Sequence, residues 1–202
     1  MNIRVLLADD QALLRGSLTE VLSRDPELEV VAACSSGNEA IALATSTQPD
    51  VALLDIDMPG LDGLQTAEQL SQTHPEIRVL ILTVLARPGY LRRALAGGAV
   101  GFILKDTPPS DLVDAIKRTH RGERVVDSTL AVQALSHGAS PLSERETEVL
   151  SLTRSTPSTK ALARELHLSD GTVRNTLSSA MRKLDAASRQ QAARIAEDQG
   201  WL

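Results

Sequence analysis

The sequence predicts a doubly wound α/β domain with a five-stranded parallel sheet, followed by a small all-α domain. Five short apolar runs before residue 121 are rich in leucine and β-branched residues and do not alternate with polar ones. Strands buried on both faces of a parallel sheet have this pattern. A helical pattern follows each run, as in repeated βα units, whereas no strand pattern remains after Leu142.

The expected strands and helices alternate along the first part of the chain. The strands are predicted at Ile3–Ala8, Glu29–Ala33, Val51–Leu54, Val79–Leu82 and Gly101–Leu104. The helices are predicted at Ala12–Ser23, Asn38–Ser46, Gly63–Gln72, Tyr90–Ala96 and Ser110–His120. In the first helix, leucines recur at positions 14, 18 and 22, which is a helical period.

The expected boundaries are residues 1–121 for the α/β domain, 122–140 for a linker and 141–202 for the helical domain. The linker contains glycines and has weak periodicity, with one expected helical stretch near 128–136. Ser143 and Glu146 have the spacing of a capping box, and Ser169 is the expected N-cap of a later helix.

The composition excludes several classes of protein. One Trp, one Tyr and one Phe argue against folds that stack single-stranded bases on several aromatic rings. A single cysteine, Cys34, excludes a disulfide framework and a cysteine-based zinc site. The chain has no apolar run of about 18 residues, and an acidic pair comes too early for a secretory signal. We therefore expect a cytoplasmic protein without membrane insertion.

The charge is distributed unevenly along the chain. Residues 1–122 contain 11 Lys or Arg and 16 Asp or Glu, a net charge of −5. Residues 160–194 contain seven basic and three acidic residues, a net charge of +4. This asymmetry favours an acidic regulatory part and an anion-binding part.

Polar residues lie where the expected strands end. Asp9 and Asp10 follow the first strand, Asp55 the third, Thr83 the fourth and Lys105 the fifth. The carboxyl ends of parallel strands meet at one edge of the sheet, where sites gather. Crowded carboxylates there favour a hard cation such as Mg²⁺. A lysine and a hydroxyl can hold phosphoryl oxygens, and Asp55 can be the nucleophile that becomes an aspartyl phosphate.

Two other interpretations use the same residues. Each carboxylate taken alone is more often a solvated loop residue or a helix cap. The run Val51–Asp57 also fits the hhhhDxD signature of haloacid-dehalogenase-type phosphatases, with Asp55 as nucleophile and Asp57 as acid. That signature belongs on the first strand, whereas here it lies on the third, and a separate Asp pair follows the first.

The order of these five residues resembles the receiver domain of two-component response regulators, over about residues 1–120. The resemblance implies a flavodoxin-like sheet of order 2-1-3-4-5 and a regulator that is not an enzyme. It implies that a sensor histidine kinase phosphorylates Asp55. It also implies Mg²⁺ or Mn²⁺ bound by Asp10, Asp55 and the backbone carbonyl of Asp57, with Asp9 contributing through water.

The resemblance includes a switch and two departures. Thr83 and Phe102 match the family's hydroxyl–aromatic pair, in which Thr83 moves to the phosphoryl oxygen and Phe102 turns inward on phosphorylation. Many receivers have a cis peptide and a proline after the lysine, whereas Asp106 follows Lys105 here. A cis bond without proline costs about 3 kcal/mol. Asp57 adds a second acid two positions after the phosphoacceptor.

Residues 159–184 have the length pattern of a helix-turn-helix, with helices at Thr159–Leu166 and Ser169–Leu184. The second helix would enter the major groove of DNA. Its expected base contacts are Arg174, Asn175 and Ser178. The expected phosphate contacts are Lys160, Ser169, Thr172, Arg182 and Lys183. Its expected core face is Val173, Leu177, Ala180, Met181 and Leu184. By spacing alone, an ordinary helical bundle with a solvated face fits equally well.

The motifs Leu142–Leu150 and Leu168–Asn175 resemble the LuxR-type helix-turn-helix, over about residues 142–202. A receiver joined to this module resembles the NarL/FixJ family of transcriptional regulators, and residues 86–90 and 171–177 are most similar to the DesR group. Thr156-Pro157 departs from the family's usual Gly and polar residue.

This resemblance also implies partners. They are a sensor histidine kinase, promoter double-stranded DNA, RNA polymerase and a second copy of the chain, bound on phosphorylation. Membrane-lipid desaturase genes are the implied targets. The last helix, expected at Arg189–Trp201, would contribute a dimer contact through Ala192, Ile195, Ala196 and Gln199.

Overall fold

The computed structural model describes residues 2–84, 88–126, 140–153, 156 and 158–202. The chain divides into two compact units, one built on a sheet and one on helices alone. Within the described ranges, no helix is both long and apolar enough to cross a bilayer. The helical stretch expected near 128–136 lies outside the described residues.

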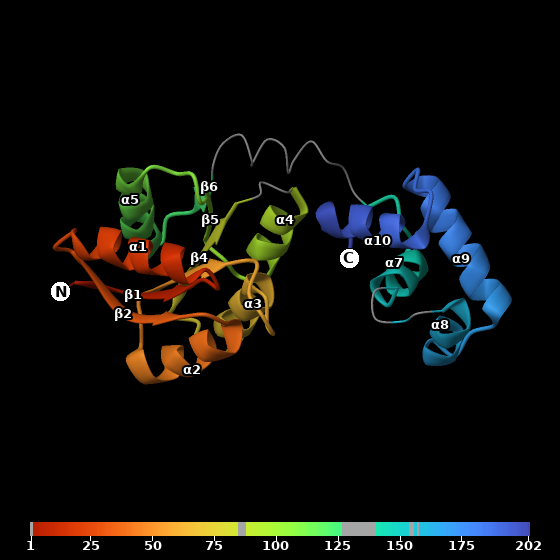
Figure 1. The fold of residues 1–202 in the computed structure, drawn as a ribbon, viewed down its shortest axis with the longest axis horizontal. Helices are drawn as coiled ribbons and strands as arrows, with labels where there is room; N and C mark the ends of the chain where they lie inside the picture. Colours follow the sequence, from red (N-terminus) through yellow and green to blue (C-terminus); the bar gives the residue numbers. More distant parts are fainter. Residues whose placement is uncertain (1, 85–87, 127–139, 154–155, 157) are drawn as a thin grey trace. The chain divides into compact units, whose positions relative to one another are not determined.

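A parallel sheet of order β2-β1-β3-β4-β5-β6 forms the centre of the first unit (Figure 1). The strands are β1 Ile3–Ala8, β2 Leu28–Cys34, β3 Val51–Asp55, β4 Arg78–Thr83, β5 Gly101–Leu104 and β6 Val125–Val126. The predicted order of the first five strands is confirmed, and their ends lie within one residue of the predicted ends.

Helices cover both faces of this sheet. They are α1 Ala12–Ser23, α2 Gly37–Thr47, α3 Gly63–Thr73, α4 Pro88–Ala96 and α5 Pro109–His120. Figure 1 shows α1 and α5 on one face and α2, α3 and α4 on the other. On the first face, Leu22 of α1 and Ile116 of α5 are fully buried with Val5, Leu53 and Leu80 of the strands. Burial from both sides explains why the strands show no polar alternation.

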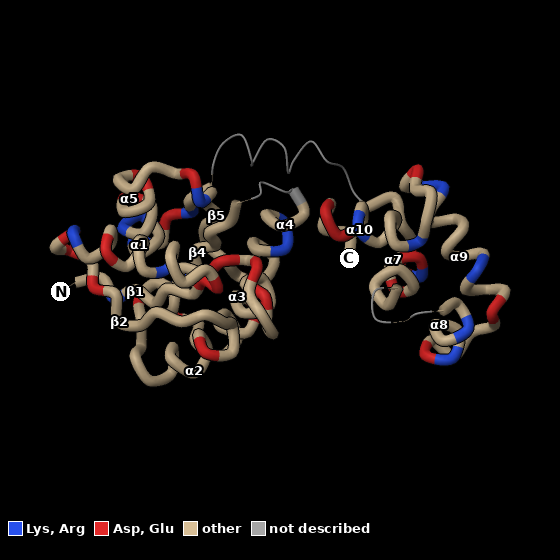
Figure 2. The backbone as a smooth tube through the Cα atoms, viewed as in Figure 1, with Lys and Arg blue, Asp and Glu red and all other residues tan. Residues whose placement is uncertain are grey.

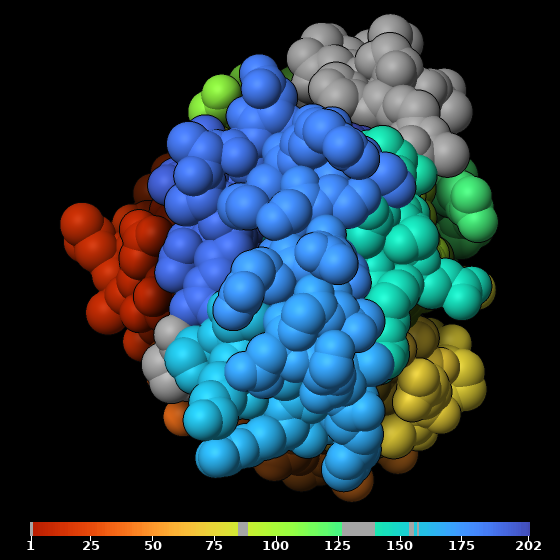
Figure 3. All heavy atoms as spheres, turned by 90° about the vertical axis from the view of Figure 1, so that its right-hand side faces the viewer, coloured from red at the N-terminus to blue at the C-terminus, as the bar shows by residue number. Residues whose placement is uncertain are grey.

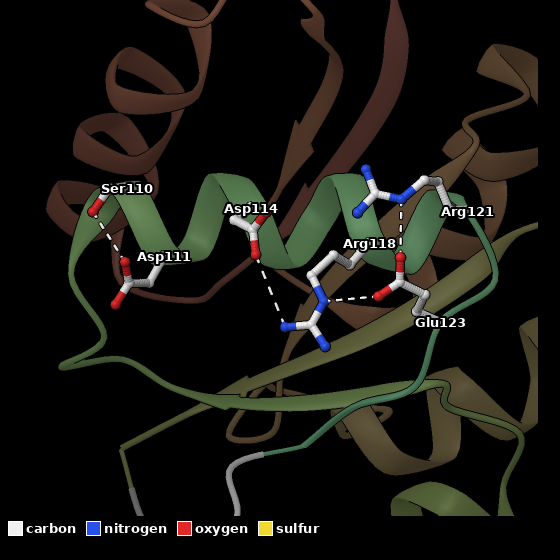
Figure 4. A network of polar contacts seen from close by, with 6 residues as sticks. All are labelled: Ser110, Asp111, Asp114, Arg118, Arg121 and Glu123. Atoms are coloured by element: carbon white, nitrogen blue, oxygen red, sulfur yellow. Dashed lines mark hydrogen bonds and ion pairs between the residues drawn. The ribbon is translucent and has the colours of Figure 1, made fainter.

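The sixth strand corrects the prediction of five strands, and it lies within residues 122–140, the expected linker. β6 has only two residues, which is too short to show a strand pattern in the sequence. The Val125 N–H donates to the Val100 carbonyl at 3.2 Å. Glu123, in the turn before β6, accepts hydrogen bonds from Arg118 and Arg121, both at 2.9 Å (Figure 4). This network links the turn to the end of α5. The strand β6 pairs with β5 and lies at the edge of the sheet.

The second unit contains α7 Glu144–Ser151, α8 Thr159–Glu165, α9 Asp170–Lys183 and α10 Arg189–Asp198. Each helix begins after a serine whose hydroxyl accepts a backbone N–H three residues later, at Ser143, Ser158, Ser169 and Ser188. The predicted caps at Ser143 and Ser169 are therefore confirmed. Such a cap stabilises a helix by about 1 kcal/mol. The pair α8–α9 forms the expected helix-turn-helix.

The core of this unit includes the face of α9 that the sequence predicts. Val173, Leu177, Ala180 and Leu184 are buried, and Met181 packs against them partly buried. Of the four residues implied for a dimer contact on the last helix, Ala192 and Ala196 are fully buried in the same core, whereas Ile195 and Gln199 are partly exposed. The two alanine side chains close the helical bundle and are not available to a second copy.

Candidate functional site

The first candidate site lies at the carboxyl edge of the sheet. Asp9 follows β1 directly, Asp55 ends β3 and Thr83 ends β4. Asp55 lies opposite Leu82 in the register of β3 and β4. Lys105 follows β5, and its backbone N–H donates to the Thr83 carbonyl at 2.7 Å. The parallel strands therefore bring residues that are far apart in sequence to one edge.

Lys105 bridges two buried carboxylates. Its Nζ lies 2.8 Å from Asp9 Oδ2 and 2.9 Å from Asp55 Oδ2, and the exposed fraction of each of these side chains is at most 5%. One ammonium neutralises only one of the two acids. The other oxygen of Asp55, Oδ1, is buried and has no hydrogen-bond partner among the described residues. A buried carboxylate oxygen without a partner is costly unless a ligand or ion satisfies it.

A third carboxylate completes the cluster. Asp9, Asp10 and Asp55 each offer an oxygen within 4.8 Å of the others, and Asp10 is exposed to solvent. Three carboxylates and one lysine leave a net charge of −2, and every donor is a hard oxygen. This donor set fits a hard divalent cation such as Mg²⁺ or Mn²⁺. Asp57 is exposed in the loop after β3.

The electrostatics of the edge follow from burial. Burial raises the pKa of the Asp55 carboxyl above its ordinary value, against the hydrogen bond and charge of Lys105, while the charges of Asp9 and Asp57 raise it further. Burial lowers the pKa of Lys105, but its bonds to Asp9 and Asp55 outweigh that effect and the net change is upward. A bound cation would favour the ionised form of Asp55.

Two local features hold this geometry. The Gln11 N–H donates to Asp9 Oδ1 at 2.8 Å, which orients the carboxylate after β1. A Cβ on Gly63 would lie 2.0 Å from the Asp55 carbonyl oxygen, so the start of α3 comes close to Asp55 only because residue 63 is glycine. Gly63 was not among the expected site residues. The dipeptide Asp62-Gly63, in which Asp62 is the N-cap of α3, signals a turn. It does not show that residue 63 lies against the backbone of Asp55.

The proposed switch residues are both buried. Thr83 is 1% exposed and Phe102 is fully buried on β5. The Lys105–Asp106 peptide is trans.

The second candidate site is the exposed face of α9. Arg174, Asn175 and Ser178 are exposed, and α9 runs across the face of the second unit turned to the viewer in Figure 3. Basic residues of α8 and α9 are blue in Figure 2. Lys160 and Arg182 are exposed as well.

Three of the expected phosphate contacts already have partners within the unit. The Ser169 hydroxyl accepts the Thr172 N–H at 3.0 Å and lies 2.8 Å from the Thr172 hydroxyl. The Nζ of Lys183 lies 2.7 Å from Oε2 of Glu146. The structure therefore brings the expected base contacts to an open surface, but it directs Lys183 to a neighbouring helix.

Comparisons with known proteins match both units. Residues 5–117 match the response regulator receiver domain, and residues 140–196 match the bacterial regulatory proteins of the luxR family. The transcriptional regulatory protein DesR of Bacillus subtilis (strain 168) is 39% identical over 200 residues, covering 99% of each chain. The uncharacterised transcriptional regulatory protein YvfU of the same strain is 40% identical over 200 residues, covering 99% of this chain and 100% of YvfU.

A solved structure is similar over the whole chain. The response regulator ChrA of a heme-sensing two-component system is 33% identical, with a TM-score of 0.60. The similarity covers 100% of this chain and 99% of ChrA.

Proposed function

The chain belongs to the NarL/FixJ family of response regulators, a receiver joined to a LuxR-type DNA-binding domain, and within it we propose that Asp55 accepts the phosphoryl group. Members of this family regulate transcription in a phosphorylation-dependent way and are not enzymes. The observation that carries the proposal is the buried Asp55 Oδ1, which has no hydrogen-bond partner in the described part of the chain, beside Lys105. The proposed donor is the phosphohistidine of a sensor kinase.

The residues at the carboxyl edge of the sheet have different roles in phosphoryl transfer. Asp55 Oδ1 attacks the phosphorus as the P–N bond to the kinase histidine breaks, and the imidazole leaves with a proton from solvent. Lys105 then holds one phosphoryl oxygen through its ammonium, and the Thr83 hydroxyl donates to another. Because Lys105 starts between Asp9 and Asp55, it needs no large movement to reach the new oxygens.

The acidic residues would hold the cation. Asp10, Asp55 and the Asp57 carbonyl would bind Mg²⁺ or Mn²⁺, with Asp9 acting through water. The support is the oxygen-only cluster and its excess of negative charge. The cation supplies charge neutralisation between the carboxylates and the phosphoryl oxygens.

The proposed output is paired DNA binding. Phosphorylation would drive homodimerisation, which raises the effective concentration of two helix-turn-helix units at a promoter that RNA polymerase also binds. On each unit, Arg174, Asn175 and Ser178 would read bases. Lys160, Ser169, Thr172 and Arg182 would contact phosphates. The exposure of these side chains supports the assignment.

A narrower proposal concerns the target genes. The similarity to DesR over the full chain, with the resemblance at residues 86–90 and 171–177, favours promoters of membrane-lipid desaturase genes. Footprinting on such promoters from the same genome should show protection by the phosphorylated chain. Equal protection of unrelated promoters would contradict this narrower target.

The phosphoacceptor can be tested with a small acyl phosphate. The full chain is incubated with acetyl phosphate and Mg²⁺ and resolved on a phosphate-affinity gel. We expect one retarded band that Asp55→Asn abolishes. Asp57→Asn is the matched control, since it changes an exposed acid two residues away and keeps the backbone carbonyl. A band of equal strength in Asp55→Asn would refute the assignment.

A further inference from the structure

An ion pair between the buried Glu146 and the partly exposed Lys183 joins α7 to the recognition helix α9. Glu146 is only 5% exposed, and its Oε2 lies 2.7 Å from Nζ of Lys183. The same oxygen accepts the Ser143 N–H at 2.6 Å. The hydroxyl of Ser179, one turn before Lys183, is among the groups that lower the pKa of this carboxyl. Groups from α9 and from the N-cap of α7 therefore meet at one buried charge.

The carboxylate has a fixed place at the start of α7. Ser143 and Glu146 form a capping box, in which the Ser143 hydroxyl accepts the Glu146 N–H and the Glu146 side chain accepts the Ser143 N–H. This exchange restrains the Glu146 side chain. Lys183 is the last residue of α9. The end of α9 is thus tied to the start of α7.

Lys183 lies on the side of α9 opposite Arg174, although it is only about 80° around the helix from Asn175. An α-helix turns about 100° per residue, and Lys183 comes nine residues after Arg174, so the two side chains point in about opposite directions. Arg174, Ser178 and Arg182 instead recur every four residues and share one exposed stripe. The stripe faces away from the Glu146 contact.

We propose that Lys183 is a positioning residue, which with Glu146 and Ser179 fixes the rotation and axial position of α9 on α7. This positioning role replaces the phosphate contact that the sequence suggests for Lys183. The inference rests on the proposed reading of bases by α9. Its consequence is that Lys183 determines whether Arg174 and Asn175 reach the base edges.

The rest of the α7–α9 interface does not by itself restrain rotation of α9. The core there is apolar, with Val149 and Leu150 packed among Val173 and Leu177. Apolar burial is non-directional, so it resists separation of the helices more than a small rotation. A short charge-assisted hydrogen bond instead joins one point on each helix, so a rotation of α9 lengthens it. Base contacts have strict geometry, so a small rotation removes them before it removes phosphate contacts.

The test separates positioning from charge. The unaltered full chain, activated with beryllofluoride, first selects a duplex from a random pool. Affinities for this duplex and for a scrambled duplex of equal composition are then measured over a salt series. Lys183→Met is compared with Arg182→Met, which removes the same charge from the next residue on the exposed stripe.

The two variants should behave differently. Lys183→Met should lose about tenfold on the selected duplex and little on the scrambled one, with an unchanged slope of log K against log salt. Arg182→Met should weaken both duplexes alike and reduce that slope by about one. Lys183→Arg should restore most of the preference. Glu146→Gln should also lose the preference, although it removes a negative charge and so cannot weaken a phosphate contact.

Folding is checked in the same samples. Trp201 is the sole tryptophan of the chain and packs against the core of the second unit, so its fluorescence reports on that unit. A slope reduced by about one in Lys183→Met would overturn the proposal, because Lys183 would then be a phosphate contact. Unchanged binding by a folded Lys183→Met would overturn it as well. An unaltered chain that enriches no duplex would contradict the proposed function and, with it, this inference.

Discussion

Burial of the Asp55 side chain disfavours the ionised form of its carboxyl group. Its Oδ2 pairs with Lys105 at 2.9 Å, yet burial and the neighbouring acids keep the carboxyl pKa raised. Because the folded-state pKa is raised, ionisation of Asp55 costs stability at neutral pH, and this cost is lost as the pH falls through the folded-state pKa. The same excess of negative charge would favour a bound divalent cation.

Replacement of this charge should therefore stabilise the first unit. We expect Asp55→Asn to raise the midpoint of thermal unfolding in the presence of a chelator. Added Mg²⁺ should stabilise the unaltered chain, since a ligand that binds only the folded state shifts the equilibrium, and should leave the variant unchanged. Asp106→Asn, at an exposed acid next to Lys105, is the control and should keep the Mg²⁺ response. Equal Mg²⁺ responses in both variants would count against a cation at Asp55.

At the scale of elements, the start of α3 controls the place of Asp55. A methyl group at Gly63 would meet the backbone of Asp55 at 2.0 Å. We expect Gly63→Ala to destabilise the first unit by about 2 kcal/mol, as overpacking does, and to slow phosphorylation by acetyl phosphate. Urea unfolding followed by circular dichroism measures the first effect.

Gly16 offers the matched control for this substitution. It lies inside α1, and a Cβ there meets no atom within 4 Å. Gly16→Ala should therefore stabilise the unit by about 1 kcal/mol through helix propensity and leave phosphorylation unchanged. A Gly63→Ala variant that matches Gly16→Ala in both measurements would show that α3 does not constrain Asp55.

The α7–α9 contact predicts a pH dependence for the second unit. Burial acts to raise the pKa of Glu146, but bonds from Lys183, the Ser143 N–H and the Ser179 hydroxyl outweigh it and lower the pKa from 4.5 to about 2. The stabilisation by the ionised carboxylate is present above about pH 4.5 and is lost as the pH falls toward 2. At about 1.36 kcal/mol per pKa unit, this stabilisation amounts to about 3 kcal/mol.

Acid titration of Trp201 fluorescence in moderate urea measures this effect. The unaltered second unit should lose stability between about pH 4.5 and 2. Glu146→Gln should be less stable at pH 7 and flat over that range, because it has no carboxyl to titrate. A parallel fall in both chains would place the acid sensitivity in other residues.

For the whole molecule, the sequence predicts much of the architecture because its signals are local. Apolar runs locate the strands within one residue, and serines locate the starts of α7 and α9. The strand ends suffice to group Asp9, Asp55 and Lys105 at one edge. β6 was missed because two residues carry no period, and the partner of Lys183 was missed because Glu146 lies 37 positions away in the sequence.

Dimerisation on phosphorylation also concerns the whole molecule. Because the proposed phosphoacceptor Asp55 lies in the first unit, we expect that unit to contribute to the dimer contact. Sedimentation velocity of the full chain with Mg²⁺ should show a shift from monomer to dimer when beryllofluoride is added. The shift should be absent in Asp55→Asn. A dimer of equal strength without beryllofluoride would show that phosphorylation does not control assembly.

The measurement that tests the central claim most directly is DNA affinity as a function of the state of Asp55. Fluorescence anisotropy with a labelled duplex selected by the activated chain is recorded with and without beryllofluoride, for the unaltered chain and for Asp55→Asn. The account predicts an affinity at least about tenfold higher with beryllofluoride, as coupling of this kind provides, and no change in Asp55→Asn. Equal affinities in the two states of the unaltered chain, or an equal gain in Asp55→Asn, would contradict it.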